Sequence, residues 1–176
     1  MAKVNLISIV AESPGIVTEA IEYLLKKYKK IKNIVFYPKD ERIKWRIKLL
    51  KNFLKKYENV ESVFLKLPVE DITSEKDIKK FLNFVKKIRK ELKSKNTYFN
   101  ITGGRKIMLL VLYKFLIKSK VRAKLLNIIS YLPREEVGVL EDILKEKIEN
   151  GIEPNEEEIR KYLFSNNNYK VFEIKL

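Results

Sequence analysis

The first 134 residues alternate between two hydrophobic patterns. Continuous apolar runs are typical of strands buried on both faces of a sheet, and they predict strands at 4–10, 33–37, 60–67, 97–101 and 124–132. Between these runs, apolar residues recur at helical spacing, which predicts helices at 17–28, 43–57, 73–92 and 105–119. Four successive strand–helix units predict a parallel sheet with right-handed crossovers and helices on both of its faces.

The segment 105–119 is apolar nearly all round, so we expect this helix to be well buried. The remaining residues, 135–176, predict two helices (135–150 and 155–164) and a closing strand (169–176). Because no stretch has the composition of a linker, we expect residues 1–176 to form one domain. Its core would be 1–134, and 135–176 would be a helical extension with the closing strand.

This pattern predicts a Rossmann-like, doubly wound α/β fold with a mainly parallel sheet. The strand order in such sheets is commonly 3-2-1-4-5, and ligands bind where the order reverses, at the carboxyl ends of strands 1 and 4. The loops that follow the first and fourth predicted strands should therefore be neighbours.

These two loops carry the candidate chemistry. The first reads Ser13-Pro14-Gly15-Ile16-Val17-Thr18-Glu19, and the second reads Asn100-Ile101-Thr102-Gly103-Gly104-Arg105-Lys106. Each opens a helix, where unpaired N–H groups and the positive end of the helix dipole attract anions. Together they predict a pocket for a ligand with several phosphates.

The residue types within the loops fit phosphate binding. Gly103 and Gly104 let the backbone approach a ligand closely, Arg105 offers a planar fork for a phosphate, and Lys106 offers a point charge. A structural explanation is also open: a tight turn with solvated basic residues, and Ser13 as a helix cap. Neither loop has a dinucleotide fingerprint or a Walker phosphate loop, which disfavours a plain nicotinamide or ATP enzyme.

The composition narrows the chemistry further. Histidine and cysteine are both absent, which excludes Ser-His-Asp triads, paired-histidine ribonucleases and the usual zinc sites. No compact cluster of Asp and Glu follows the predicted strands, so we expect no metal site and no cofactor. The chain has no apolar run long enough to span a membrane and no signal peptide, so we expect a cytoplasmic protein.

Charge is unevenly distributed. The net charge is +15, yet residues 135–160 hold ten acidic residues against three basic ones. The excess of base therefore lies in residues 1–134, and a basic body of this kind attracts polyanions.

Residues Val10–Ala20 and Asn100–Lys106 resemble the corresponding loops of the CRISPR-associated Rossmann-fold (CARF) domains, which sense cyclic oligoadenylates. The resemblance covers roughly residues 1–134. In the usual form of the first motif Gly-Thr precedes Ser-Pro, whereas Ala11 and Glu12 stand there in this chain. A CARF domain of this length is similar to the ring nucleases, which bind cyclic tetra-adenylate at a homodimer interface and cleave it without a metal.

The resemblance implies roles for individual residues. The implied catalytic residues are Ser13, Arg105, Lys106 and, near the C-terminus, Lys170. The implied ligand-binding residues are Pro14, Gly15, Thr18, Asn100, Thr102, Gly103 and Gly104. The substrate's own 2′-OH would attack the adjacent phosphate, leaving a linear product with a 2′,3′-cyclic phosphate and switching off the antiviral signal.

Two alternatives remain open. A non-catalytic sensor would bind the same ligand and signal to a partner protein through the acidic segment 135–160. A general nucleic-acid binder would use the basic body, but the interleaved aromatic residues expected of single-strand binders are not evident in the sequence.

Overall fold

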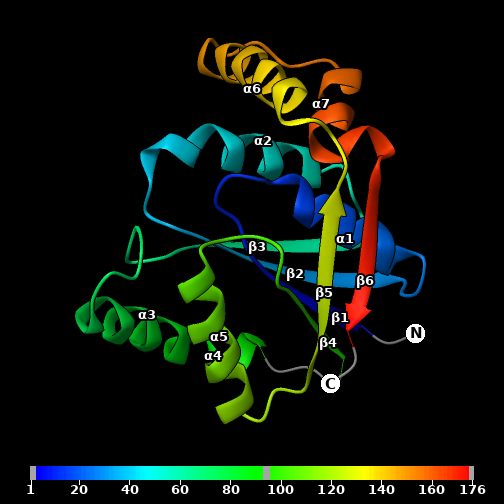
Figure 1. Ribbon diagram of the computed structural model, residues 1–176. Coiled ribbons are helices and arrows are strands. Elements are labelled where there is room, and N and C mark those ends of the chain that lie inside the picture. Colours follow the sequence, from blue (N-terminus) through cyan, green and yellow to red (C-terminus); the bar gives the residue numbers. More distant parts are fainter. Residues whose placement is uncertain (1–2, 93–95, 175–176) are drawn as a thin grey trace.

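The computed structural model describes residues 3–92 and 96–174. These residues contain one six-stranded sheet, which Figure 1 shows with its helices. The strand order is β3-β2-β1-β4-β5-β6. The first five strands are parallel, and β6 pairs antiparallel with β5. The strands are β1 (Lys3–Ile9), β2 (Lys30–Tyr37), β3 (Val60–Lys66), β4 (Thr97–Asn100), β5 (Ala123–Ser130) and β6 (Tyr169–Ile174). The predicted α/β class and the reversal between β1 and β4 are confirmed.

Helices cover both faces of the sheet (Figure 1). One layer contains α1 (Gly15–Leu25), α2 (Lys44–Leu54), α6 (Arg134–Glu149) and α7 (Glu156–Leu163), and the other contains α3 (Glu75–Lys87), α4 (Arg89–Leu92) and α5 (Lys106–Lys118). Short 3-10 turns lie at Glu41–Ile43 and Ser165–Asn167. The predicted helix 73–92 is divided into α3 and α4, and residues 175 and 176 of the predicted closing strand lie outside the described residues.

The two faces of the sheet form two separate cores, because successive residues of a strand point to opposite faces. In β1, Leu6 packs with α1 and α2, whereas Ile7 packs with α3 and α5. Both residues are fully buried. Because β1 is apolar on both faces, it is stable only in the middle of the sheet. This position places the loop after β1 beside the loop after β4.

Helix α5 is less buried than its sequence predicts. Met108, Leu112 and Leu116 face the core, but Ile107, Leu110 and Ile117 are 49%, 67% and 56% exposed. The expectation of a well-buried helix is therefore wrong. The physical reason is that α5 packs on the sheet and against α3, while the described residues provide nothing to cover its outer side.

The acidic extension packs on the basic helix α2. Arg46 forms an ion pair with Glu141 of α6 (Nη2 to Oε2, 2.8 Å), and Tyr162 of α7 donates a hydrogen bond to the same carboxylate at 2.7 Å. The Tyr162 ring also stacks on Trp45, with centroids 5.8 Å apart. This ion pair neutralises, within the fold, part of the opposite charges of the basic residues 1–134 and the acidic segment 135–160.

Among the helices of residues 3–92 and 96–174, none is both long enough and apolar enough to cross a membrane.

Candidate functional site

A buried asparagine joins the two loops that the sequence singled out. The Asn100 side chain, fully buried at the end of β4, donates from Nδ2 to the carbonyl of Ile16 at 2.9 Å. Its Oδ1 accepts a hydrogen bond from the backbone N–H of Thr102 at 3.0 Å. One side chain therefore fixes the start of α1 against the loop before α5, and the two predicted anion-binding loops lie side by side.

The two glycines of the second loop allow this close approach. A Cβ at Gly103 would overlap Ile16 Cδ1 and lie 2.6 Å from the Ile9 carbonyl oxygen. Gly104 has φ +77°, and a Cβ there would lie 2.6 Å from Ile9 Cγ2. The contacts that require glycine are thus contacts of the second loop with the end of β1 and the start of α1. The backbone N–H groups of Gly103 and Gly104 have no hydrogen-bond partner among the described residues, so we expect them to be available to an anion.

Three residues predicted to bind ligand have side chains that form hydrogen bonds within the protein. Thr18 is 1% exposed, and its hydroxyl donates to the carbonyls of Gly15 and Leu163. The Thr102 hydroxyl accepts from Ile128 N at 2.6 Å. Both ends of the Asn100 amide are occupied, as described above. These hydrogen bonds hold the loops to α7, to β5 and to each other. Direct contact of the three residues with a ligand stays a prediction.

In the first loop, Pro14 and Gly15 are also buried, and a Cβ at Gly15 would lie 3.2 Å from the carbonyl oxygens of Tyr162 and Leu163. Ser13 is exposed. It does not cap α1, since the helix begins at Gly15 and its N-cap residue is Pro14, with no side-chain cap hydrogen bond. Its hydroxyl has no partner among the described residues and is therefore available to a ligand.

Arg105 is not a free cation. Its Nη1 lies 2.5 Å from Asp71 Oδ2, and its Nη2 lies 3.6 Å from Asp40 Oδ2. Asp40 follows β2 and Asp71 follows β3, so the guanidinium reaches across the carboxyl edge of the sheet. The ion pair with Arg42 lowers the pKa of Asp40 below its usual range, with a smaller contribution from Arg105. Sequence reasoning missed both carboxylates, although each follows a proline-terminated strand.

Lys106 and Lys170 are both exposed. Lys106 is the first residue of α5 and follows the glycine loop directly. Lys170 lies near the start of β6, opposite Ile129, and its Nζ is 5.9 Å from the ring centroid of Tyr131. Because β6 is antiparallel to β5, its first residues lie at the same edge of the sheet as the two loops.

A buried carboxyl group supports the turn before Lys170. Glu19 is 1% exposed and accepts a hydrogen bond from Ser165 Oγ at 2.5 Å, and Ser130 Oγ is 2.7 Å from the same hydroxyl. Burial raises the pKa of Glu19 to about 7, although the hydrogen bond from Ser165 opposes the shift. Ser165, Asn166 and Asn167 all have positive φ angles, a conformation that is strained for residues other than glycine.

Within the part of the chain that the structure describes, no group of three or more Asp and Glu side chains is placed to hold a metal ion. The two loops instead present backbone N–H groups, a hydroxyl and a lysine that have no partner among the described residues. This set of groups can bind phosphate and stabilise additional negative charge on it.

The fold and the site define a Rossmann-like domain in which the loops after β1 and β4 are joined. The sequence profile described as CRISPR-associated protein NE0113 matches residues 13–119, which include both loops. The chain belongs to this CRISPR-associated family, and the predicted relationship to the CARF domains is confirmed.

A curated relative is the CRISPR system ring nuclease SSO2081 of Saccharolobus solfataricus, which is 37% identical over 111 residues. The match covers 60% of each chain, so this chain spans only part of the relative's length.

Two solved structures share the fold. Protein VC1899 from Vibrio cholerae superposes with a TM-score of 0.51 at 17% identity, over 69% of this chain and 30% of that one. Enterococcus italicus Csm6, bound to cyclic hexa-2′-fluoro-hexa-dAMP, superposes with a TM-score of 0.51 at 13% identity, over 99% of this chain and 42% of that one.

Proposed function

We propose that the protein is a ring nuclease that binds cyclic tetra-adenylate between the loops after β1 and β4 and cleaves it. Such cleavage would switch off type III CRISPR antiviral signalling. The observation that carries the proposal is the Asn100–Ile16 hydrogen bond, which holds the loop of Ser13 against the loop of Lys106. The ring nuclease name of the relative from S. solfataricus supports it.

The proposed reaction uses a nucleophile that the substrate carries. A ribose 2′-oxygen attacks the adjacent phosphorus, the bond from phosphorus to the 5′-oxygen breaks, and the proton lost from the 2′-OH is balanced by one gained at the 5′-oxygen. The product is linear and ends in a 2′,3′-cyclic phosphate. This route needs in-line positioning and charge stabilisation rather than imidazole, and the chain contains no histidine.

The protein groups have distinct roles in this scheme. The N–H groups of Gly103 and Gly104, together with Lys106, stabilise the extra charge on the phosphorane. Ser13 orients the 2′-OH or a phosphate oxygen from the opposite side of the cleft. Arg105 binds phosphate after exchanging one of its carboxylate partners. Lys170 approaches the ligand from β6.

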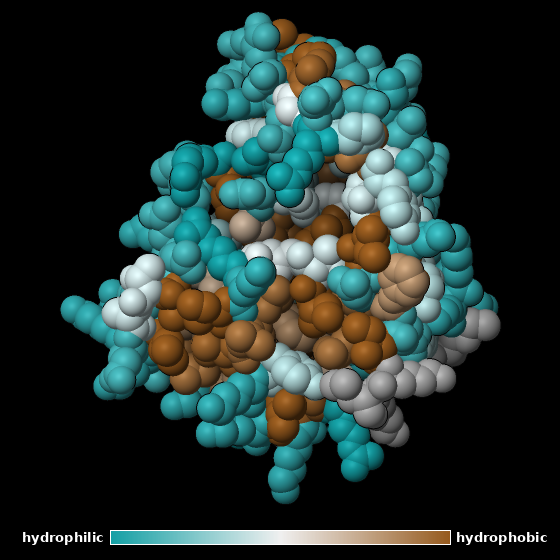
Figure 2. Space-filling view, in the orientation of Figure 1, coloured by the Kyte–Doolittle hydropathy of each residue, from teal (hydrophilic) through white to brown (hydrophobic). Residues whose placement is uncertain are grey.

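A homodimer would complete the site. The apolar residues Leu110 of α5 and Phe172 and Ile174 of β6 are 67%, 45% and 37% exposed. Figure 2 shows apolar side chains gathered on the face that carries α5 and the β5–β6 pair. Because cyclic tetra-adenylate has two-fold symmetry, an isologous dimer matches it. Sedimentation analysis should show a dimer that Leu110→Glu dissociates, and a monomer in the wild type would contradict this part of the proposal.

The direct test is incubation of the purified protein with cyclic tri-, tetra- and hexa-adenylate in EDTA, followed by chromatography. We expect the tetra-adenylate ring to be opened to linear products that carry a cyclic phosphate. Tight binding with full recovery of the intact ring after long incubation would instead favour a sensor that signals to a partner. Cleavage that stops in EDTA and resumes with a divalent cation would contradict the metal-independent route.

A further inference from the structure

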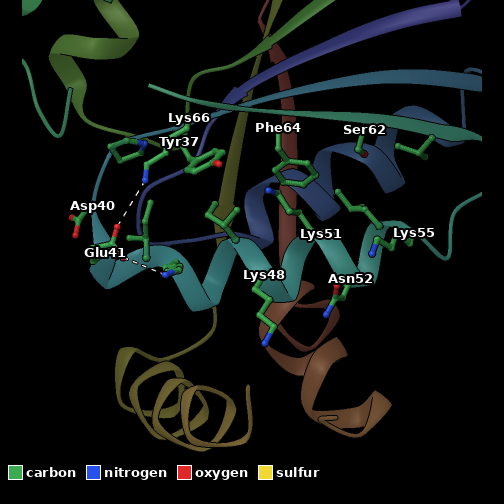
Figure 3. Close-up of a pocket in the computed structure, with 16 residues that line it drawn as sticks. Tyr37, Asp40, Glu41, Lys48, Lys51, Asn52, Lys55, Ser62, Phe64 and Lys66 are labelled. Atoms are coloured by element: carbon green, nitrogen blue, oxygen red, sulfur yellow. Dashed lines mark ion pairs between the residues drawn. The ribbon is translucent and has the colours of Figure 1, made fainter. Parts of the chain in front are cut away.

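A cavity lies away from the two loops, between α2 and the edge strand β3 (Figure 3). Its volume is about 670 Å³. The cavity exists because β3 is the last strand of the sheet and α2 covers it only in part. Phe64 and Ser62 of β3 form one side and α2 forms the other. We call this cavity the α2–β3 groove.

The groove is strongly basic. Lysines from both of its sides line it, namely Lys44, Lys48, Lys51, Lys55 and Lys66. Glu41 lies at one end, 3.5 Å from Lys44 and 3.8 Å from Lys66, and pairs with both. Lys48, Lys51 and Lys55 have no ion-pair partner among the described residues. The positive charge available to a ligand therefore lies along α2, towards the end of the groove farther from Glu41.

Two aromatic rings lie inside the groove, beneath one of these lysines. Lys51 Nζ is 5.2 Å from the ring centroid of Phe64 and 5.5 Å from that of Tyr37. In Figure 3 the Lys51 side chain points from α2 towards Phe64, whereas Lys48 points outward from the helix. Both rings are partly exposed, so a flat ligand can reach them once Lys51 swings outward.

Together these features favour one class of ligand. Aromatic faces within a basic groove stack the bases of a single strand while lysines hold its phosphates. Lys48 lies on α2 and Lys55 is its C-cap residue, about 10 Å further along the helix axis. This spacing suits successive phosphates of a strand better than a single phosphate. We infer that the α2–β3 groove binds single-stranded nucleic acid, with phosphates along α2 and bases on Phe64 and Tyr37. This inference is independent of the proposed cleavage reaction.

The test is fluorescence anisotropy with a labelled oligoadenylate of about twelve nucleotides, long enough to fill such a site. RNA and DNA forms of the probe determine which sugar is preferred. If three lysines each neutralise one phosphate, affinity should fall about 20-fold when salt rises from about 50 to 200 mM. The combined change Lys48→Ala, Lys51→Ala and Lys55→Ala should remove most of this salt dependence. It should also weaken binding about 20-fold at low salt.

Two control variants distinguish binding in the α2–β3 groove from attraction to the positive charge of the surface in general. The matched variant replaces three exposed lysines of α3, on the opposite face of the sheet, with alanine: Lys79, Lys86 and Lys87. This variant should keep at least half of the wild-type affinity. Phe64→Leu retains an apolar side chain but removes the stacking surface, and should weaken binding about tenfold.

Several outcomes would overturn the inference: no binding by the wild type, equal losses in the α2 and α3 triple variants, or no change in Phe64→Leu. Equally tight binding of a polyglutamate peptide would also overturn it, because that peptide has charge without bases. The α2 triple variant should cleave cyclic tetra-adenylate at the wild-type rate. Failure of the groove therefore leaves the proposed nuclease intact, and failure of the nuclease leaves the groove intact.

Discussion

Arg105 Nη1 lies 2.5 Å from Asp71 Oδ2, so the arginine expected to bind phosphate is already bound to a carboxylate. Asp40 provides a second, longer contact with the same guanidinium at 3.6 Å. A phosphate that binds Arg105 must compete with these carboxylates. The loops after β2 and β3 are thereby coupled to the proposed cleft, although neither carries a predicted ligand-binding residue.

This arrangement predicts an unusual gain of affinity. Asp71→Asn removes one charge that competes with phosphate for Arg105, so cyclic tetra-adenylate should bind about fivefold more tightly. This factor corresponds to about 1 kcal/mol, the free energy of a partly exposed ion pair. Equilibrium binding at low salt measures the effect. The same substitution in an Arg105→Ala background should have no effect, because the interaction then has no partner. Weaker binding by Asp71→Asn would show that Asp71 positions Arg105 and does not compete for it.

The Asn100 side chain bridges the two loops through its hydrogen bonds to Ile16 and Thr102. This bridge predicts that one substitution lowers both stability and ligand affinity. Asn100→Ala leaves the carbonyl of Ile16 and the N–H of Thr102 without their partner, which should destabilise the fold by about 2 to 4 kcal/mol. Ligand affinity should also fall about tenfold at temperatures where the variant remains folded, because the loops separate. Urea unfolding and calorimetric binding measure the two quantities.

Asn33 provides the matched control for this bridge. It is also a fully buried asparagine, on β2, but its amide donates to Ser62 Oγ, away from the loops. Asn33→Ala should destabilise the fold without changing ligand affinity. Equal losses of affinity in both variants would mean that general destabilisation, and not loop positioning, explains the effect of Asn100→Ala.

The glycines predict opposite effects of one substitution at two sites. Gly103→Ala places a Cβ against Ile16 and the Ile9 carbonyl and should destabilise the protein by about 1 to 3 kcal/mol. Gly138→Ala lies in α6 with no atom within 4 Å of the added Cβ, and should stabilise it by up to about 1 kcal/mol. Midpoints of urea unfolding provide the comparison. A Gly103→Ala variant as stable as the wild type would contradict the tight contact between the loops.

Glu19 predicts the direction of a pH effect on stability. Its pKa is raised from 4.5 to about 7 in the folded protein, so the folded state binds more protons than the unfolded state between these values. Stability is therefore greatest below about pH 4.5 with respect to this group. It falls as pH rises to about 7, by up to about 3 kcal/mol.

Urea unfolding of the wild type and of Glu19→Gln between pH 4.5 and 8 measures this contribution. Glu19→Gln keeps an oxygen that accepts from Ser165 but cannot ionise, so its stability should depend little on pH over that range. The two proteins should differ most at the higher pH. Parallel pH profiles for the two proteins would show that Glu19 titrates normally.

The sequence predicted the arrangement of the backbone well, because the apolar runs record which strands are buried on both faces. The reversal between β1 and β4 followed from the doubly wound order, and it placed the two loops together. The burial of α5 was not predicted correctly. The apolar side chain of Leu110 indicates that its burial is favourable. The sequence does not indicate whether the surface that covers it belongs to the same chain.

Side-chain direction was the other information that the sequence lacked. Thr18 and Thr102 occur in the predicted loops, but their hydroxyls turn inward to carbonyl and N–H groups contributed by α7 and β5. Asp71 lies 34 residues before Arg105, and no local pattern relates the two. Ser13 and Lys106 remain candidate catalytic residues because the fold leaves both exposed and without a partner among the described residues.

The central claim is that the loops after β1 and β4 act on one phosphate. The most direct measurement is the single-turnover rate of cyclic tetra-adenylate cleavage by the wild type, Ser13→Ala and Lys106→Ala, with unfolding curves as the control. We predict normal stability for both variants and a rate about 100 to 1000 times lower for Lys106→Ala, with a clear loss for Ser13→Ala as well. A stable variant of either loop that cleaves at the wild-type rate would contradict the account.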